Sequence, residues 1–189
     1  MKLEDTAIAG VKILTPARFS DERGFFSESW NRARLAAAGI GIDFVQDNHS
    51  LSRRKGTVRG LHFQAPPHAQ AKLVRCGRGA LRDVAVDIRR GSPTYGRWVA
   101  AELSAENGRQ MLIPEGCAHG FVTLSDDTEI IYKCSDYYAP ECDRALQFDD
   151  PEIGIDWGVT RDEALLSDKD AAAPALRDLG SPFTWEGAA

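Results

Sequence analysis

The sequence predicts an all-β fold, either an antiparallel sandwich or a barrel, with short helices near its two ends. The clearest observation is segment 81–88, where Val84, Val86 and Ile88 fall on one face of a strand in the period-two pattern. Four more short apolar segments are separated by turn-forming residues, and they span 97–103, 110–113, 120–124 and 129–134. Many short strands at this spacing are typical of two-layered or closed antiparallel folds.

Helical signals occur in only two places. Segment 31–38 is rich in alanine and is followed by Gly39, a residue suited to a helix C-terminus. Near the other end, the sequence Ser-Asp-Lys-Asp at 167–170 leads into three alanines and Pro174, so any helix there is short. No linker composition divides the chain, and we therefore expect one domain spanning residues 1–189.

Composition excludes several classes of protein. The net charge of −5 argues against a nucleic-acid-binding surface, which is normally basic. The apolar runs are too short to span a membrane, and the first residues lack the basic head and apolar stretch of a signal peptide, so we expect a cytoplasmic protein. The four cysteines contain no C-x-x-C pair, and we expect free, mostly buried thiols, with a zinc or disulfide role as the alternative.

The common phosphate-binding and nucleophile motifs are absent from the sequence. It contains no G-x-x-x-x-G-K-[ST] loop, no strand followed by G-x-G-x-x-G, and no G-x-S-x-G elbow. These absences count against kinases, doubly wound nicotinamide dehydrogenases and the common serine hydrolases.

One local pattern stands out in the second half of the chain. The spacing Gly108-x5-Pro114-x-Gly116-x2-His119 resembles the second cupin motif, a turn that places a histidine inside a small β-barrel. The first cupin motif needs a His-x-His pair, whereas this chain has only His62 at that point. Since a mononuclear metal site needs three or four convergent ligands, we expect no catalytic metal and no cofactor.

The segment around His62 predicts a strand at the mouth of the barrel. In a regular strand Arg59 and Leu61 share one face, while Gly60, His62 and Gln64 share the other. A basic residue and an imidazole beside a small glycine suit a place where a ligand approaches the backbone closely.

Several separate strings lie in order between about residue 3 and about residue 176. They are DERGFF at 21–26, FVQDNHS at 44–50, RGLHFQ at 59–64, KLVR at 72–75, DVAVDIR at 83–89, IPEGCAHGF at 113–121, YK at 132–133 and LSDKD at 166–170. Together these strings resemble the dTDP-4-dehydrorhamnose 3,5-epimerase family. The resemblance implies a cupin-type jelly roll, a dTDP-linked 4-keto-6-deoxy sugar as substrate, and a homodimer.

The resemblance also implies four catalytic residues. Carbons 3 and 5 flank the C4 ketone, so loss of either proton is eased by enolate formation, and His62 is the implied base. Asp170 would orient His62, Tyr132 would return the proton, and Lys72 would stabilise the enolate. From the sequence alone three plainer roles stay open: a capping box for Asp170, a core position for Tyr132 and a solvated strand edge for Lys72.

The implied substrate-binding residues lie at the nucleotide end of the site. Arg23 and Arg59 have the bidentate geometry that suits a diphosphate. Gln46 and Asn48 carry amides that can read a base or sugar, and Tyr138 would stack on the base, although Tyr137 and Tyr138 also pass as a strand pair. The resemblance adds Phe26, Glu28, Asp47, His119, Asp143 and Lys169, and Asp143 departs from the family pattern, in which Glu is more usual.

Alternative functions remain open at this level. A relative could invert only C3 or only C5, a cupin ketoisomerase could move the carbonyl by the same enolate chemistry, and a sugar-binding cupin would have no turnover. The N-terminal segment 21–30, which carries Arg23 and Glu28, is expected to complete the site of a partner subunit; the alternative is that it serves its own chain.

Overall fold

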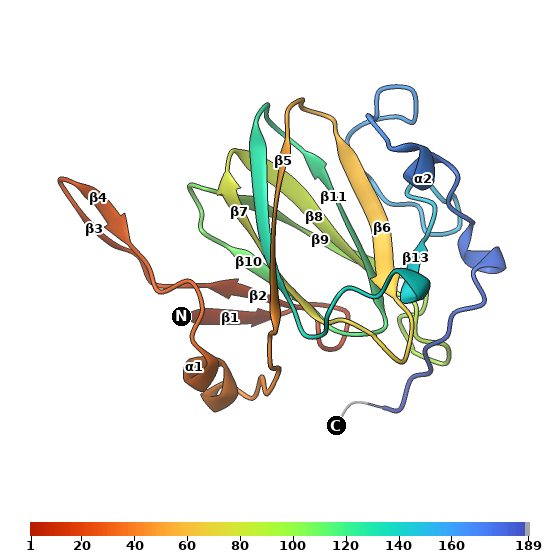
Figure 1. Cartoon of the computed structure of the whole chain (residues 1–189), viewed down its shortest axis with the longest axis horizontal. Coiled ribbons are helices and arrows are strands. Elements are labelled where there is room, and N and C mark those ends of the chain that lie inside the picture. Colours follow the sequence, from red (N-terminus) through yellow and green to blue (C-terminus); the bar gives the residue numbers. More distant parts are fainter. Residues whose placement is uncertain (188–189) are drawn as a thin grey trace.

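The computed structural model describes residues 1–187, so the last two residues of the predicted 1–189 domain lie outside the described residues. Figure 1 shows two facing sheets, a hairpin that projects from one side, and a C-terminal segment that runs along the opposite side. All strand pairings within the sheets are antiparallel. The expected all-β class, with a cupin-type jelly roll, is confirmed.

The first sheet has six strands in the order β1-β2-β10-β7-β12-β5. Their bounds are β1 Lys2–Asp5, β2 Lys12–Thr15, β10 Gln110–Ile113, β7 Lys72–Arg78, β12 Thr128–Cys134 and β5 Gln46–Ser52. The second sheet has five strands in the order β13-β6-β11-β8-β9. They are β13 Asp143–Ala145, β6 Val58–Gln64, β11 Cys117–Thr123, β8 Ala80–Asp87 and β9 Trp98–Ser104.

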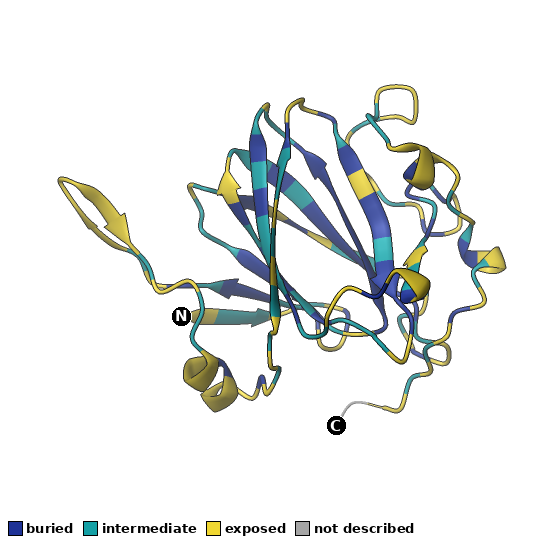
Figure 2. Cartoon of the chain, viewed as in Figure 1, coloured by how far each residue is buried: buried dark blue, intermediate teal, exposed yellow. Residues whose placement is uncertain are grey.

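The remaining elements are short. Strands β3 (Phe19–Asp21) and β4 (Gly24–Phe26) form the projecting hairpin, which is mostly exposed (Figure 2). The two α-helices are α1 (Arg32–Ala37) and α2 (Asp168–Ala171), and two 3-10 turns lie at Pro140–Cys142 and Leu176–Asp178. Within residues 1–187, no helix has the length and apolar character needed to cross a membrane.

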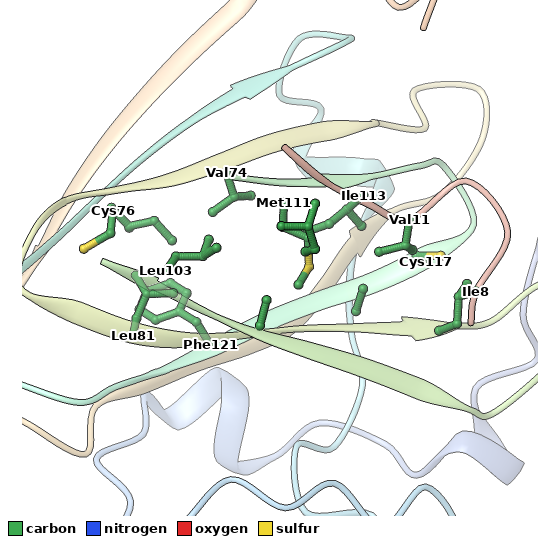
Figure 3. Packing of buried hydrophobic residues seen from close by; sticks show 14 residues of the cluster. Ile8, Val11, Val74, Cys76, Leu81, Leu103, Met111, Ile113, Cys117 and Phe121 are labelled. Atoms are coloured by element: carbon green, nitrogen blue, oxygen red, sulfur yellow. The ribbon is translucent and has the colours of Figure 1, made fainter. Parts of the chain in front are cut away.

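The main core lies between the two sheets (Figure 3). Side chains from the six-stranded sheet, such as Val74 and Met111, meet Leu81, Leu103 and Phe121 from the five-stranded sheet. A second cluster, which contains Val84, Val86 and Ile88, covers the outer face of the five-stranded sheet with residues from the C-terminal part of the chain. Strand β8 is therefore buried on both faces, and its predicted shared face is confirmed. Burying this much apolar surface is the main stabilising contribution to the sandwich.

The predicted local signals mostly match the structure. Asn31 caps α1 by accepting a hydrogen bond from the Arg34 N–H, and Gly39 follows the helix with a φ of +81°, as its sequence position predicted. Strand β11 begins at Cys117, earlier than expected, because the turn ends at Gly116. All four cysteines are free and buried, as expected.

Strict alternation fails in β6. His62 pairs with His119 on β11, but Arg59 pairs with Phe121, so β6 carries one additional residue between these two positions. Gly60 lies in this bulge with a φ of +122°, and a Cβ atom there would lie 2.5 Å from the Cα of Gly120. Because of this extra residue, the side chains before the bulge point to the opposite side of the sheet from the one that strict alternation predicts. Arg59 therefore turns to the same side as His62, whereas Leu61 is fully buried in the outer cluster.

Candidate active site

A cavity of about 550 Å³ is bounded by strands of both sheets and by the C-terminal segment. The predicted residues that line it are Arg59, His62, Lys72, His119, Tyr132, Lys169 and Asp170. The rest of the wall consists of Ser50, Thr57, Val58, Phe121, Leu165, Leu166 and Ser167. Seven of the fifteen sequence-predicted residues are thus brought together from β6, β7, β11, β12 and the C-terminal segment.

A smaller cavity of about 170 Å³ adjoins the first. The two share His62, Lys72, Tyr132 and Lys169, so they are two parts of one cleft. The smaller part adds four further predicted residues, namely Gln46, Asn48, Tyr138 and Asp143. The cleft therefore has a wide end beside His62 and Asp170, and a polar end beside Tyr138.

His62 and Asp170 form a close pair in which Nε2 of His62 lies 2.5 Å from Oδ1 of Asp170. The backbone N–H of Asp170 also donates to the Ser167 hydroxyl, so Asp170 belongs to the cap of α2 and orients His62 at once. Burial raises the pKa of Asp170, but the hydrogen bond and charge of His62, with bonds from Ser167 and the Gly60 backbone, outweigh it, so its pKa is lowered overall. Asp170 is therefore a carboxylate at neutral pH.

Lys72 and Tyr132 extend into the cleft from neighbouring strands of the six-stranded sheet. Lys72 lies on an interior strand and is half-buried, so it is not a solvated edge lysine. Burial lowers the pKa of Lys72, against the opposing charges of Cys134, Asp143 and Asp83. Burial raises the pKa of Tyr132, which keeps the phenol protonated. Tyr132 also packs against the main core, so it is at once a core residue and part of the cleft wall.

A second histidine–carboxylate pair lies beside the first. Nε2 of His119 is 2.7 Å from Oδ1 of Asp83, and both side chains are buried. The other carboxylate oxygen of Asp83 has no hydrogen-bond partner among the described residues. Sequence reasoning missed Asp83, although a charged residue facing inward from β8, opposite the apolar Val84 face, was the available signal.

Arg59 is fixed by strand β5. Its Nε donates to the Ser52 hydroxyl at 3.2 Å, and its Nη2 donates to the carbonyl of Leu51 at 3.3 Å. These bonds hold the guanidinium at the side of the cleft, where it can meet an anionic group.

The polar end is linked by side-chain bonds. The Gln46 amide oxygen accepts from the backbone N–H of Tyr138 at 3.0 Å, and the Tyr138 hydroxyl donates to Asp143 at 3.3 Å. Lys169 forms an ion pair with the same Asp143 carboxylate. Tyr137 and Tyr138 are exposed loop residues, so they are not a strand pair.

Four predicted residues do not reach this cleft within the chain. Arg23 is paired with Asp21 at the tip of the hairpin and its side chain is 84% exposed, and Phe26 is exposed on the same hairpin. Glu28 is paired with Arg34 at 3.1 Å. Asp47 lies on the opposite face of β5 from Gln46 and Asn48, where it pairs with Lys133 at 2.8 Å.

Metal ligation is the alternative chemistry of the histidines. Across residues 1–187, no group of three or more His, Cys, Asp or Glu side chains is arranged to hold a metal ion. His62 and His119 each pair with one carboxylate instead. The arrangement is suited to proton transfer and to holding an oxyanion.

Comparison with known proteins supplies the family. A sequence model of the dTDP-4-dehydrorhamnose 3,5-epimerase family matches residues 5–178. The dTDP-4-dehydrorhamnose 3,5-epimerase of Sinorhizobium fredii is 53% identical over 189 residues, with 98% of this chain and 94% of the relative covered.

Two solved structures are similar over nearly the whole chain. The dTDP-6-deoxy-D-glucose-3,5-epimerase of Legionella pneumophila, in complex with dTDP-4-keto-L-rhamnose, has a TM-score of 0.93 and 45% identity and covers 98% of this chain and 99% of its own. A 3'-monoepimerase of Streptomyces bikiniensis in complex with dTDP-quinovose has a TM-score of 0.85 and 37% identity. The match covers 93% of this chain and 88% of the monoepimerase chain. With the cleft, its paired histidines and these matches together, the chain belongs to the dTDP-4-dehydrorhamnose 3,5-epimerase family.

Proposed function

We propose that this enzyme inverts C3 and C5 of dTDP-4-dehydro-6-deoxy-D-glucose to give dTDP-4-dehydro-L-rhamnose, without a cofactor. The observation that carries the proposal is the placement of the His62–Asp170 pair and Tyr132 on opposite walls of one cleft. His62 comes from the five-stranded sheet and Tyr132 from the six-stranded sheet.

His62 acts as the base. A neutral imidazole that donates its Nε2–H to Asp170 keeps the lone pair on Nδ1, and Nδ1 then removes the proton beside the ketone. The Asp170 carboxylate stabilises the imidazolium that forms. The proton removed from C3 or C5 thus stays on His62 while the electrons move to the C4 oxygen.

Lys72 and His119 hold the enolate oxygen. Fixed donors in a site shielded from water stabilise developing charge better than mobile solvent does. The Lys72 ammonium is the main positive charge, and His119 is fixed by Asp83. This arrangement replaces the metal ion that a metal-dependent enolate enzyme would use.

Tyr132 returns a proton from the opposite face. Inversion requires removal and delivery on opposite sides of the ring, and a sugar held between the two sheets has His62 on one side and Tyr132 on the other. The raised pKa keeps the phenol in its protonated form at neutral pH. His62 then releases its proton to solvent and the Tyr132 phenolate takes one up, so that the second inversion can repeat the step at the other carbon that flanks the ketone.

The nucleotide occupies the polar end of the cleft. Its diphosphate reaches toward the wide part, where Arg59, together with Lys169 at the junction of the two parts, supplies positive charge. The amides of Gln46 and Asn48 read the base or sugar, and Tyr138 stacks on the base. Asp143 positions Tyr138 and Lys169 through its carboxylate.

The working unit is a homodimer in the cytoplasm. The hairpin projects away from the two sheets of its own chain (Figure 1). It exposes Phe19, Phe25 and Phe26, and an exposed apolar patch of this kind marks an interaction surface. Strand β5, which carries Gln46 and Asn48, is an edge strand, so its free side offers a place for a strand of the partner. Arg23, Phe26 and Glu28 then complete the partner's polar end.

Proton NMR in heavy water tests the reaction. With dTDP-4-keto-6-deoxyglucose as substrate, deuterium should enter at both C3 and C5, because each inversion passes through an enolate. Deuterium at C3 alone would replace the proposal with a 3-epimerase activity like that of the Streptomyces relative. The absence of label at either carbon would rule out epimerase activity.

A further inference from the structure

Gln64 is a buried amide whose hydrogen bonds all go to the backbone of two loops. It lies at the end of β6, two residues after His62, and is 4% exposed. Its Nε2 donates to the carbonyl of His68 at 2.7 Å and to the carbonyl of Tyr137 at 3.1 Å. Its Oε1 accepts from the N–H of Ala139 at 2.8 Å. Both the nitrogen and the oxygen of the amide are therefore hydrogen-bonded, and all of their partners are backbone groups.

The bonds of Gln64 bracket Tyr138. One goes to the residue before Tyr138 and one to the residue after it, so the peptide groups on both sides of this tyrosine are tied to β6. The Tyr138 N–H itself is bound by Gln46 from β5. Three consecutive loop residues are thus fixed by two glutamines from two different sheets.

The ring of Tyr138 has little packing of its own. The residue is 58% exposed, and its hydroxyl makes one bond, at 3.3 Å to Asp143. Because the ring has few contacts, its position is set mainly by the backbone of the loop. Ordering this loop before the ligand arrives removes a cost that binding would otherwise carry.

We propose that Gln64 is a positioning residue for nucleotide recognition: it holds segment 137–139 so that Tyr138 presents its ring to the base. The inference rests on the proposed function, because it takes Tyr138 as the stacking residue. It predicts that Gln64 matters for nucleotide affinity and that its effect passes through Tyr138.

The test measures dTDP binding by calorimetry in Gln64→Glu, Tyr138→Leu and the double variant. Gln64→Glu keeps the shape of the side chain and the oxygen that accepts from the Ala139 N–H. It replaces the amide nitrogen, which donates to the carbonyls of His68 and Tyr137, with a second acceptor oxygen. We expect Gln64→Glu to weaken dTDP binding about tenfold, on the order of one base–aromatic stack. In the Tyr138→Leu background the same change should cost no further affinity. For turnover, KM should rise while kcat stays near wild type.

Two additional variants separate positioning from general stability. Gln64→Met removes the amide without adding charge and should show the same loss of dTDP affinity. Ser181→Ala is the matched control, because Ser181 is buried and lines neither part of the cleft. Its hydroxyl donates to the carbonyl of Ile88, directly after β8, and accepts from the N–H of Phe183. This control variant should lower the thermal midpoint without changing dTDP affinity.

Three outcomes would overturn these conclusions. Unchanged dTDP affinity in folded Gln64→Glu and Gln64→Met would refute the positioning role alone. A further loss in the Tyr138→Leu background, as large as in the wild-type background, would refute it as well, because Gln64 would then act on the nucleotide independently of Tyr138. Failure of the wild-type chain to bind dTDP would instead reject the proposed function, and the inference with it.

Discussion

The two paired histidines of the cleft differ in ways that suit different tasks. His62 keeps 32% of its side chain exposed, whereas His119 is almost fully buried, although the two are cross-strand partners. The Asp170 carboxylate accepts a hydrogen bond from His62 and is further stabilised by Ser167 and the Gly60 backbone, while one oxygen of Asp83 has no partner among the described residues. A base must meet the proton that it removes, and His62 has the access. His119 is better placed to hold an oxygen in a fixed position.

The first prediction concerns His62. His62→Asn should lower kcat by about 10²–10⁴, the usual effect of removing a general base, while dTDP affinity changes little. His49→Asn is the control, since His49 also pairs with a carboxylate, Glu129, but does not line the cleft. Steady-state kinetics on the two folded variants makes the comparison. Near-normal turnover of His62→Asn would remove His62 from the chemistry.

Tyr132 gives a prediction about the two halves of the reaction. If Tyr132 delivers the proton opposite His62, Tyr132→Phe should still exchange substrate protons with solvent but form little inverted product. NMR follows deuterium entry and product formation in the same sample. Tyr95→Phe, a tyrosine outside the cleft, should leave both rates unchanged. If exchange and inversion fell together, Tyr132 would be a positioning residue.

At the level of elements, strand β6 shows where sequence reasoning succeeds and where it stops. The strand itself, and the placement of His62 at the barrel mouth, follow from the sequence. The facing of Arg59 does not, because the bulge at Gly60 shifts the period by one residue. The close approach of Gly60 to Gly120 explains this bulge, but it joins strands far apart in the chain, which a local pattern does not contain.

The end of β8 carries a buried carboxylate that is important for stability. Asp87 is fully buried and accepts hydrogen bonds from Arg89, Ser92 and Thr94. Asp87→Asn should therefore lower the free energy of unfolding by about 3 kcal/mol at pH 7, because it breaks a buried ion pair. Asp5→Asn, which alters an exposed pair with Lys12, should cost less than about 1 kcal/mol. Urea unfolding measures both changes.

The contribution of the Asp87 carboxylate to the free energy of unfolding depends on pH. Burial raises the pKa of Asp87, but the hydrogen bonds from Arg89, Ser92 and Thr94 outweigh it, so its pKa in the folded state lies below the ordinary value of 3.8. The unfolded state then binds more protons, so this contribution is complete above about pH 4 and is lost as pH falls through the folded pKa. The difference in stability between wild type and Asp87→Asn should shrink from pH 7 to pH 3. A constant difference would show that the Asp87 charge is not responsible.

At the scale of the whole molecule, the fold brings together residues that are far apart in the sequence. Asp170 reaches His62 because Leu165 forms a bridge with Thr57 at the start of β6, which draws the C-terminal segment along that strand. No spacing in the sequence predicts this contact, and the family resemblance supplied it. Conversely, Arg23 and Glu28 are remote from the cleft within one chain, so their predicted role depends on a second subunit.

The last prediction tests that second subunit. Arg23→Ala and His62→Asn should each be nearly inactive alone. In a mixed dimer with the hairpin acting in trans, one site combines both defects and the other has neither. Random mixing at equal amounts should then restore about one quarter of wild-type activity, since half of the dimers are mixed and half of their sites are intact. Two differently tagged His62→Asn chains, mixed as the control, should regain nothing. If mixed dimers form, as shown by co-purification through both tags, and activity does not return, Arg23 serves the site of its own chain.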